Sequence, residues 1–217
     1  VSTRPGAADI DAAEEERRLM PALEMLLHRF PDALFSVDTY RPLIAERAIA
    51  AGAAMINDVS GGTFDERMIP LIAEKDVPYV LMHMKGQPKN MQQHPHYDDV
   101  VKEVYDFFEQ QTGRFAAHGF DKIILDPGFG FGKSLNHNYQ LLNAMDCFLK
   151  LGYPLLAGMS RKSMLYKLLD NEASDALNAT TVVNTIALIK GASVLRVHDV
   201  REAREAVLIV DKLNNNG

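Results

Sequence analysis

Polar side chains that could bind a ligand recur at the ends of six short apolar segments of the sequence. In chain order these side chains are Asp38, Asn57 with Asp58, His83, Asp126, Ser160, and Arg196 with His198. A carboxylate accepts hydrogen bonds from the N–H groups of a heterocycle, an amide both donates and accepts, and an Arg/His pair binds anions. Packing requirements alone would not end six segments in polar groups. The pattern therefore predicts one polar site that gathers these residues.

The elements that position these residues alternate between strand-like and helix-like patterns. Apolar runs predict strands at 33–39, 54–60, 78–84, 122–128, 154–160 and 194–200. Amphipathic stretches predict helices at about 9–29, 100–119, 176–191 and 201–213. Near-continuous apolar strands are typical of parallel sheets buried on both faces, so we expect a parallel α/β sheet or barrel. Ligands bind at the carboxyl edge of such folds, which is where the polar residues fall.

The loop DPGFGFGKS, residues 126–134, ends like a phosphate-binding P-loop. A P-loop requires a glycine at the position that Pro127 occupies, and proline has no N–H to donate to a phosphate. Glycines at 128, 130 and 132 allow close approach of a ligand. We interpret the segment as a ligand-binding loop in which Asp126 is the functional residue, with a plain Gly-rich turn as the alternative.

Asp38 and Asn57 are the next two candidates. A carboxylate such as Asp38 can stabilise developing positive charge, or it can cap the following helix, although Thr39 could cap that helix instead. Asn57 and Asp58 point to opposite faces if the strand continues that far, so one would serve the site and the other the structure.

Two basic clusters suit an anion. Ser160, Arg161 and Lys162 lie at a strand-to-helix turn, where hydroxyl, ammonium and backbone N–H groups can bind a carboxylate or phosphate. A solvated basic turn is the alternative. Arg196 and His198 alternate on one face and form a possible anion clamp, whereas a structural pairing of His198 with Asp199 is the other possibility.

The segment 82–97 is less informative. Met82 and Met84 flank His83, so pocket and core roles must be divided among the three. His94 and His96 resemble a metal pair, but this spacing alone is a weak signal, and we predict no metal site on protein ligands.

Composition limits the classes of protein. The chain has 217 residues, 47% hydrophobic and 24% charged, as expected for one globular domain spanning 1–217. Its net charge of −6 argues against general binding to nucleic acid or anionic membranes. Cys147 is the single cysteine, and no apolar run approaches 18 residues, so we predict a cytoplasmic protein.

Taken together, the motifs resemble the dihydropteroate synthase family. The matching segments are STRPGA, FSVDTY, INDVSGG, LMHMKGQPKNMQ, DPGFGFGK, GMSRKSM and RVHDV, in the family's order. The resemblance implies a TIM barrel, a homodimer, and the joining of 4-aminobenzoate to 6-hydroxymethyl-7,8-dihydropterin pyrophosphate with assistance from Mg²⁺. It also implies inhibition by sulfonamides.

The resemblance further assigns roles by motif. Asp38 would stabilise the cationic dihydropterin and, with Lys162 and Asp126, form the catalytic set. The pterin would contact Asn57, Asp126 and Lys162, lined by Met82, Phe131 and Gly158. Arg196 and His198 would hold the phosphates. The aminobenzoate region would be formed by Thr3, Arg4 and Ser160.

The family has two further strands before the STRPGA motif, so we expect a barrel whose first two strands are missing from this chain. We therefore expect residues 1–217 alone to be poorly soluble or inactive. A pterin-binding methyltransferase of the same superfamily and a catalytically silent pterin-binding fragment are the alternative functions. The SRKSM and RVHDV motifs argue against the methyltransferase.

Overall fold

Six parallel strands form one sheet in the computed structural model, which describes residues 10–86, 91 and 95–215. The strands pair in sequence order as β1 (Ser36–Asp38), β2 (Met55–Asp58), β3 (Tyr79–Met82), β4 (Ile123–Asp126), β5 (Leu155–Ala157) and β6 (Ala192–Leu195). All six expected strands are confirmed. Each is shorter than its apolar run.

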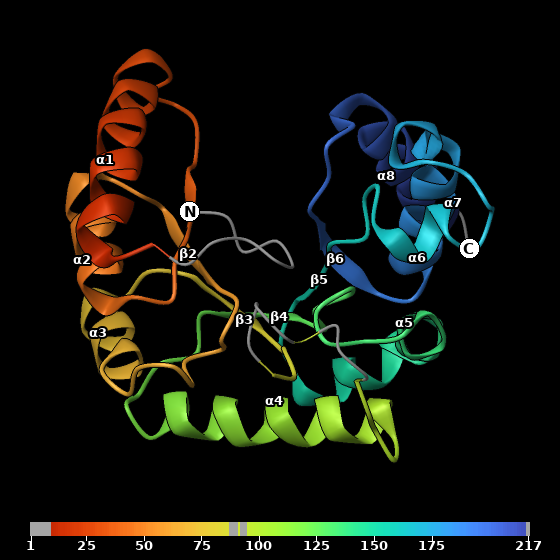
Figure 1. The fold of residues 1–217 in the computed structure, drawn as a ribbon, viewed down its shortest axis with the longest axis horizontal. Coiled ribbons are helices and arrows are strands. Elements are labelled where there is room, and N and C mark those ends of the chain that lie inside the picture. Colours follow the sequence, from red (N-terminus) through yellow and green to blue (C-terminus); the bar gives the residue numbers. More distant parts are fainter. Residues whose placement is uncertain (1–9, 87–90, 92–94, 216–217) are drawn as a thin grey trace.

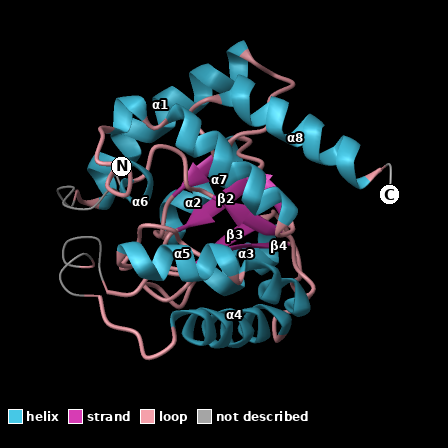
Figure 2. Cartoon of the chain, turned by 90° about the vertical axis from the view of Figure 1, so that its right-hand side faces the viewer, coloured by secondary structure: helices cyan, strands magenta, loops and turns pink. Residues whose placement is uncertain are grey.

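Helices surround the sheet. They are α1 (Ala12–Arg29), α2 (Pro42–Ala51), α3 (Met68–Lys75), α4 (Val100–Ala116), α5 (Leu135–Asn143), α6 (Ser163–Tyr166), α7 (Leu177–Ile189) and α8 (Val200–Asn214), with 3₁₀ turns η1 (Met145–Leu151) and η2 (Ala173–Asp175). Each α-helix contacts the next along the chain, and Figure 1 shows them as an arc from α1 to α8 around the strands. Figure 2 shows the strands at the centre and the helices outside. The parallel α/β part of the expected fold is confirmed.

Local sequence signals explain where several helices begin. Asp11 accepts a hydrogen bond from the Glu14 backbone N–H at the start of α1, and Asp99 does the same for two N–H groups of α4. Ser134 caps α5 in a reciprocal pair with His137. Ser134 is therefore a helix cap, as expected for a loop that only imitates a P-loop.

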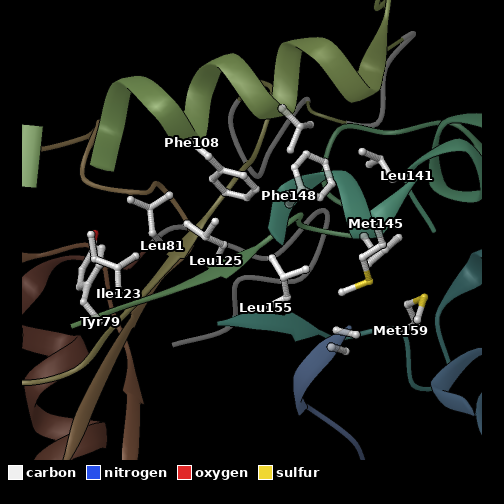
Figure 3. Close-up of a cluster of buried hydrophobic side chains, with 14 of the residues drawn as sticks. Tyr79, Leu81, Phe108, Ile123, Leu125, Leu141, Met145, Phe148, Leu155 and Met159 are labelled. Carbon is white, nitrogen blue, oxygen red and sulfur yellow. The ribbon is translucent and has the colours of Figure 1, made fainter. Parts of the chain in front are cut away.

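The main apolar cluster lies between the sheet and the helices that surround it. Figure 3 shows Phe108 of α4 and Phe148 of η1 above side chains from β3, β4 and β5. All four side chains of β3 are buried, as in a parallel strand covered on both faces. This packing fixes the strands, and with them the loops at their carboxyl ends.

The two edges of the sheet differ from its interior. Within the described residues, β1 pairs only with β2, and β6 pairs only with β5. No helix in the described part of the chain is both long enough and apolar enough to span a bilayer.

Candidate active site

A cavity of about 240 Å³ lies at the carboxyl ends of the strands. It is lined by Asp38, Asn57, Val59, Met82, Phe131, Gly158, Ser160, Lys162, Arg196, Val197 and His198. These residues come from five strand ends and from the loop 126–134. The structure thus brings together nearly all of the candidates that the sequence suggested, along the edge where the parallel fold predicts a site.

Arg196 lines this cavity and connects the ends of β2 and β4. Its guanidinium donates to Asn57 Oδ1 at 3.1 Å and to Asp126 Oδ2 at 2.7 Å. Asp126 is fully buried, and its other oxygen accepts the backbone N–H of Gly128 at 2.8 Å. Asp126 therefore meets the cavity through Arg196. The Asp126 carboxylate raises the pKa of Arg196 against the opposing effect of burial.

Gly158 makes room for this guanidinium. A Cβ at position 158 would lie 2.6 Å from an Arg196 terminal nitrogen, closer than real contacts allow. Any larger side chain would force the Arg196 guanidinium to shift from this position. The glycine at the end of β5 is thus part of the geometry of the site.

Asp38 faces the cavity and does not cap a helix. The N-cap of α2 is Arg41, and no side chain makes a capping hydrogen bond there. The surrounding protein disfavours the charged form and raises the pKa of the Asp38 carboxyl, while the Arg196 cation acts in the opposite direction. The alternative of a helix cap is therefore wrong for Asp38.

Lys162 lies opposite the Gly-rich loop. Its Nζ donates to the Phe129 carbonyl at 2.6 Å and sits 4.8 Å from the centre of the Phe131 ring. Desolvation lowers the pKa of Lys162 to about 7, although the Asp126 carboxylate opposes the change. The ammonium is held by one carbonyl and an aromatic face, which leaves it able to donate to a ligand.

Two contacts join the loop after β5 to the loop after β6. Ser160 Oγ accepts the backbone N–H of His198 and lies 2.9 Å from its Nδ1. Arg161 donates through two nitrogens to the Asp199 carboxylate at 2.8 and 2.9 Å. Asp199 thus pairs with Arg161, so the alternative of a His198–Asp199 pair is wrong. Arg196 and His198 lie beyond β6, in the loop rather than on the strand as expected.

Two polar residues at the strand ends do not join the cavity. Asp58 is buried against Ser60, Gly62 and Tyr79, which confirms that Asn57 and Asp58 divide between site and structure. His83 also turns away, because its Nδ1 lies 3.0 Å from Lys133 Nζ. The expectation that every strand end contributes to one site is wrong for His83.

Lys133 holds the Gly-rich loop in place through hydrogen bonds to its carbonyls. Its Nζ donates to the carbonyls of Gly128 and Phe131 as well as to His83. Gly128 has a φ of 67°, and a Cβ there would lie 1.9 Å from the His83 carbonyl oxygen. The loop therefore packs directly on the β3 end, and its lysine serves the scaffold.

Two expected site residues, Thr3 and Arg4, fall outside the described part of the chain, as does His94 of the weak metal-like pair. Across residues 10–86, 91 and 95–215, no group of three His, Cys, Asp or Glu side chains is placed to hold a metal ion.

One buried network beside Asp38 was not expected from the sequence. Glu15 of α1 accepts from the Thr39 hydroxyl at 2.7 Å and from Arg41, and Arg41 also donates to the Ile10 carbonyl at 2.6 Å. The partners are separated by 24 to 31 residues, so only the fold reveals them. The one signal in the sequence was Glu15 itself, an acidic residue at a position of the amphipathic α1 pattern that is buried.

Comparison with known proteins identifies the family. A family model described as "Pterin binding enzyme" matches residues 1–198. Dihydropteroate synthase of Escherichia coli (strain K12) is 43% identical over 212 residues, which cover 97% of this chain and 74% of that protein. The chain belongs to the dihydropteroate synthase family of pterin-binding enzymes.

Solved structures of this family agree with the assignment. The Yersinia pestis dihydropteroate synthase, in complex with a sulfonamide drug, has a TM-score of 0.93 and 42% identity, covering 99% of this chain and 78% of that one. The Thermus thermophilus enzyme with 4-aminobenzoate has a TM-score of 0.90 and 42% identity, covering 98% of this chain and 81% of that one. The expected family and the expected class of enzyme, a transferase with dihydropteroate synthase function, are confirmed.

Proposed function

We propose that this chain joins 4-aminobenzoate to 6-hydroxymethyl-7,8-dihydropterin pyrophosphate and releases pyrophosphate. The observation that carries the proposal is the single cavity that gathers Asp38, Asn57, Lys162 and Arg196, with Asp126 directly behind Arg196. A relative of 42% identity has been solved with 4-aminobenzoate bound. Sulfonamides are the expected inhibitors, in line with the drug complex of another relative.

The pterin ring would bind between Asn57, Lys162 and Asp126. Its N–H edge would donate to the Asp126 carboxylate, and Asn57 would pair with a neighbouring donor or acceptor of the ring. Lys162 would donate to a ring oxygen or nitrogen. Met82, Phe131 and Gly158 would contact the ring faces. A buried carboxylate suits a cyclic N–H donor, because a buried donor without an acceptor loses about 1–3 kcal/mol.

The chemistry needs a group that stabilises positive charge. When the C–O bond to pyrophosphate breaks, the electron pair leaves with the pyrophosphate and a cationic dihydropterin remains. The aminobenzoate nitrogen then forms the C–N bond and loses a proton. Asp38, which faces the cavity, is the carboxylate suited to stabilise the cation.

The phosphates and the aminobenzoate would bind on the side of the cavity that the loops after β5 and β6 form. Arg196 and His198 supply cationic and N–H donors for pyrophosphate. Ser160, which is hydrogen-bonded to His198, would border the aminobenzoate together with Thr3 and Arg4.

Mg²⁺ is proposed as a companion of the pyrophosphate. The described residues do not form a protein site for it, and Mg²⁺ is commonly held by substrate phosphates while keeping several waters. When bound, it would neutralise charge on the leaving group.

We also propose the finer assembly. Residues 1–217 would form a single pterin-binding domain that is completed by two upstream strands into an eight-stranded TIM barrel. Edge strands β1 and β6, each paired on one side within the described residues, support this view. The protein would act as a cytoplasmic homodimer. Exposed apolar side chains on α7 and α8, among them Val182, Ile186 and Leu208, support an association surface.

The test is an assay with pterin pyrophosphate, Mg²⁺ and 4-aminobenzoate, measuring dihydropteroate. It should be run on residues 1–217 and on a chain extended upstream by about 55–65 residues, the length of two strands and a helix. Dihydropteroate from the extended chain supports the function, and no product from either chain would contradict it. Full activity of the short chain as a stable dimer would contradict the need for two more strands.

A further inference from the structure

Arg196 occupies the two groups that the pterin ring needs. Its guanidinium is hydrogen-bonded to Asp126 Oδ2 and Asn57 Oδ1, whose positions in the sequence lie 70 and 139 residues away. The remaining Asp126 oxygen is engaged by the Gly128 backbone N–H. Arg196, which lines the cavity, therefore lies between the cavity and the buried Asp126 carboxylate.

The guanidinium resembles the ring edge chemically. The recognition edge of a pterin is a planar 2-amino-pyrimidinone, in which a carbon bears an amino group and two ring nitrogens. An arginine side chain likewise presents planar N–H donors around one carbon. Both suit the same carboxylate and amide, so a ring that pairs with Asp126 and Asn57 must compete with Arg196 for them.

A ligand could replace Arg196 as the hydrogen-bonding partner of Asp126. The Arg196 side chain is 37% exposed, whereas the Asp126 side chain is fully buried. Arg196 lies in the loop after β6, on a long flexible side chain, and His198 of the same loop also lines the cavity. A guanidinium in this position can leave Asp126 without unfolding any element and bind an anion near His198.

We propose that Arg196 is a specificity-determining residue that couples recognition of the ring to recognition of the pyrophosphate. Its guanidinium fills the ring's hydrogen-bonding partners until an anion draws it away. A pterin without phosphates must displace Arg196 unaided, whereas the pyrophosphate of the true substrate provides a new partner. This inference rests on the proposed function of the same cavity.

The expected size of the coupling follows from population arithmetic. If the ring can bind only when Arg196 is displaced, the apparent affinity is reduced by the fraction of molecules in the displaced state. A charge-assisted hydrogen bond contributes enough to make that factor about tenfold or more. Because binding coupling is reciprocal, pyrophosphate and pterin should each tighten the binding of the other by the same factor.

The first experiment uses the unaltered protein. Calorimetry would measure the affinity of 6-hydroxymethyl-7,8-dihydropterin, which has no phosphates, with and without saturating inorganic pyrophosphate. We expect pyrophosphate to tighten pterin binding by about tenfold. Pterin binding that is unchanged or weakened by pyrophosphate would overturn the inference. A protein that binds no pterin under either condition would instead contradict the proposed function.

The second experiment replaces the guanidinium. In Arg196→Met, phosphate-free pterin should bind about tenfold more tightly than in wild type, and the effect of pyrophosphate should disappear. Arg201→Met on α8, an exposed arginine paired with Glu205, is the control for the change in charge and should behave like wild type. Weaker pterin binding in Arg196→Met, or coupling that survives the substitution, would mean that Arg196 supports ring binding directly.

Discussion

Two buried aspartates, Asp58 at the end of β2 and Asp126 at the end of β4, show how the same residue serves different purposes. Asp58 accepts hydrogen bonds from the Ser60 backbone and hydroxyl, the Gly62 backbone and the Tyr79 hydroxyl. Asp126 accepts one backbone N–H and one side chain, that of Arg196. The partners of Asp58 are buried, whereas one oxygen of the Asp126 carboxylate is held by Arg196, whose side chain is 37% exposed.

The two lysines that flank the Gly-rich loop repeat the contrast. Desolvation lowers the pKa of both Lys133 and Lys162 to about 7. Lys133 is surrounded by carbonyl and imidazole acceptors, while Lys162 has one carbonyl and the face of Phe131. Burial and a perturbed pKa therefore do not distinguish a ligand-binding group from a structural one. The distinction lies in whether the partners can be replaced by a ligand.

The largest effect is expected at Asp38, which faces the cavity. Asp38→Asn should lower turnover by several hundredfold, about 3–4 kcal/mol, while pterin affinity and the melting temperature stay close to wild type. The reason is that a carboxylate opposite a developing cation acts mainly in the transition state. Steady-state kinetics with calorimetry of pterin binding would measure both, and a variant with full activity would remove Asp38 from the catalytic set.

A substitution at Asp58 tests the aspartate whose partners are all buried parts of the fold. Asp58→Asn should lower the free energy of unfolding by about 2–4 kcal/mol, because an amide cannot accept all of the hydrogen bonds that the carboxylate accepts and leaves buried donors unpaired. Urea denaturation measures this change.

Asp126→Asn is the matched control on the replaceable side. It should destabilise the fold less, because Arg196 can turn toward solvent, and it should weaken pterin binding by about tenfold or more. Equal losses of stability in the two variants would break the contrast between fixed and replaceable partners.

Arg161 should have a smaller effect, through position alone. Its bidentate pair with Asp199 joins the loop of Ser160 and Lys162 to that of His198. Arg161→Ala should lower kcat/KM by about tenfold, mostly by raising KM for aminobenzoate. Arg161→Lys should restore only part of kcat/KM, because lysine cannot make the second hydrogen bond to Asp199. A fall in thermal stability with unchanged KM would indicate a purely structural contact.

The last prediction concerns the pH dependence of stability and its origin at Lys133. The pKa of Lys133 is about 7 in the folded protein, compared with an ordinary value of 10.5 for the unfolded chain. Between pH 7 and pH 10.5 the unfolded chain therefore binds more protons than the folded protein. Stability should therefore rise with pH from about 7 to about 10, by up to about 1.4 kcal/mol per pH unit for each such lysine.

Lys133→Met should remove about half of that slope, since Lys162 contributes similarly. Urea denaturation at pH 7, 8 and 9 gives the slope for both proteins. Identical slopes in the variant and the wild type would show that Lys133 does not titrate in this range.

Much of the fold followed from local patterns. The six strands, the helix before the first strand, and the rejection of a P-loop at Pro127 all depend on hydrophobic runs and local backbone chemistry. The gathering of polar groups at one edge also followed, because the carboxyl ends of parallel strands meet there. The ends of the strands did not follow from these patterns, and the prediction that His83 joins the polar site was wrong.

The sequence by itself determined the family, the parallel α/β plan and the residues from which the site is built, because motifs and periodicity are properties of neighbouring positions. Tertiary structure alone decided which of these residues meet. Arg196 rests on Asn57 and Asp126, Asp199 turns to Arg161, and His83 turns to Lys133. Such pairs join residues that are tens of positions or more apart, and only the closing of the sheet and its helices brings their charges within hydrogen-bonding distance.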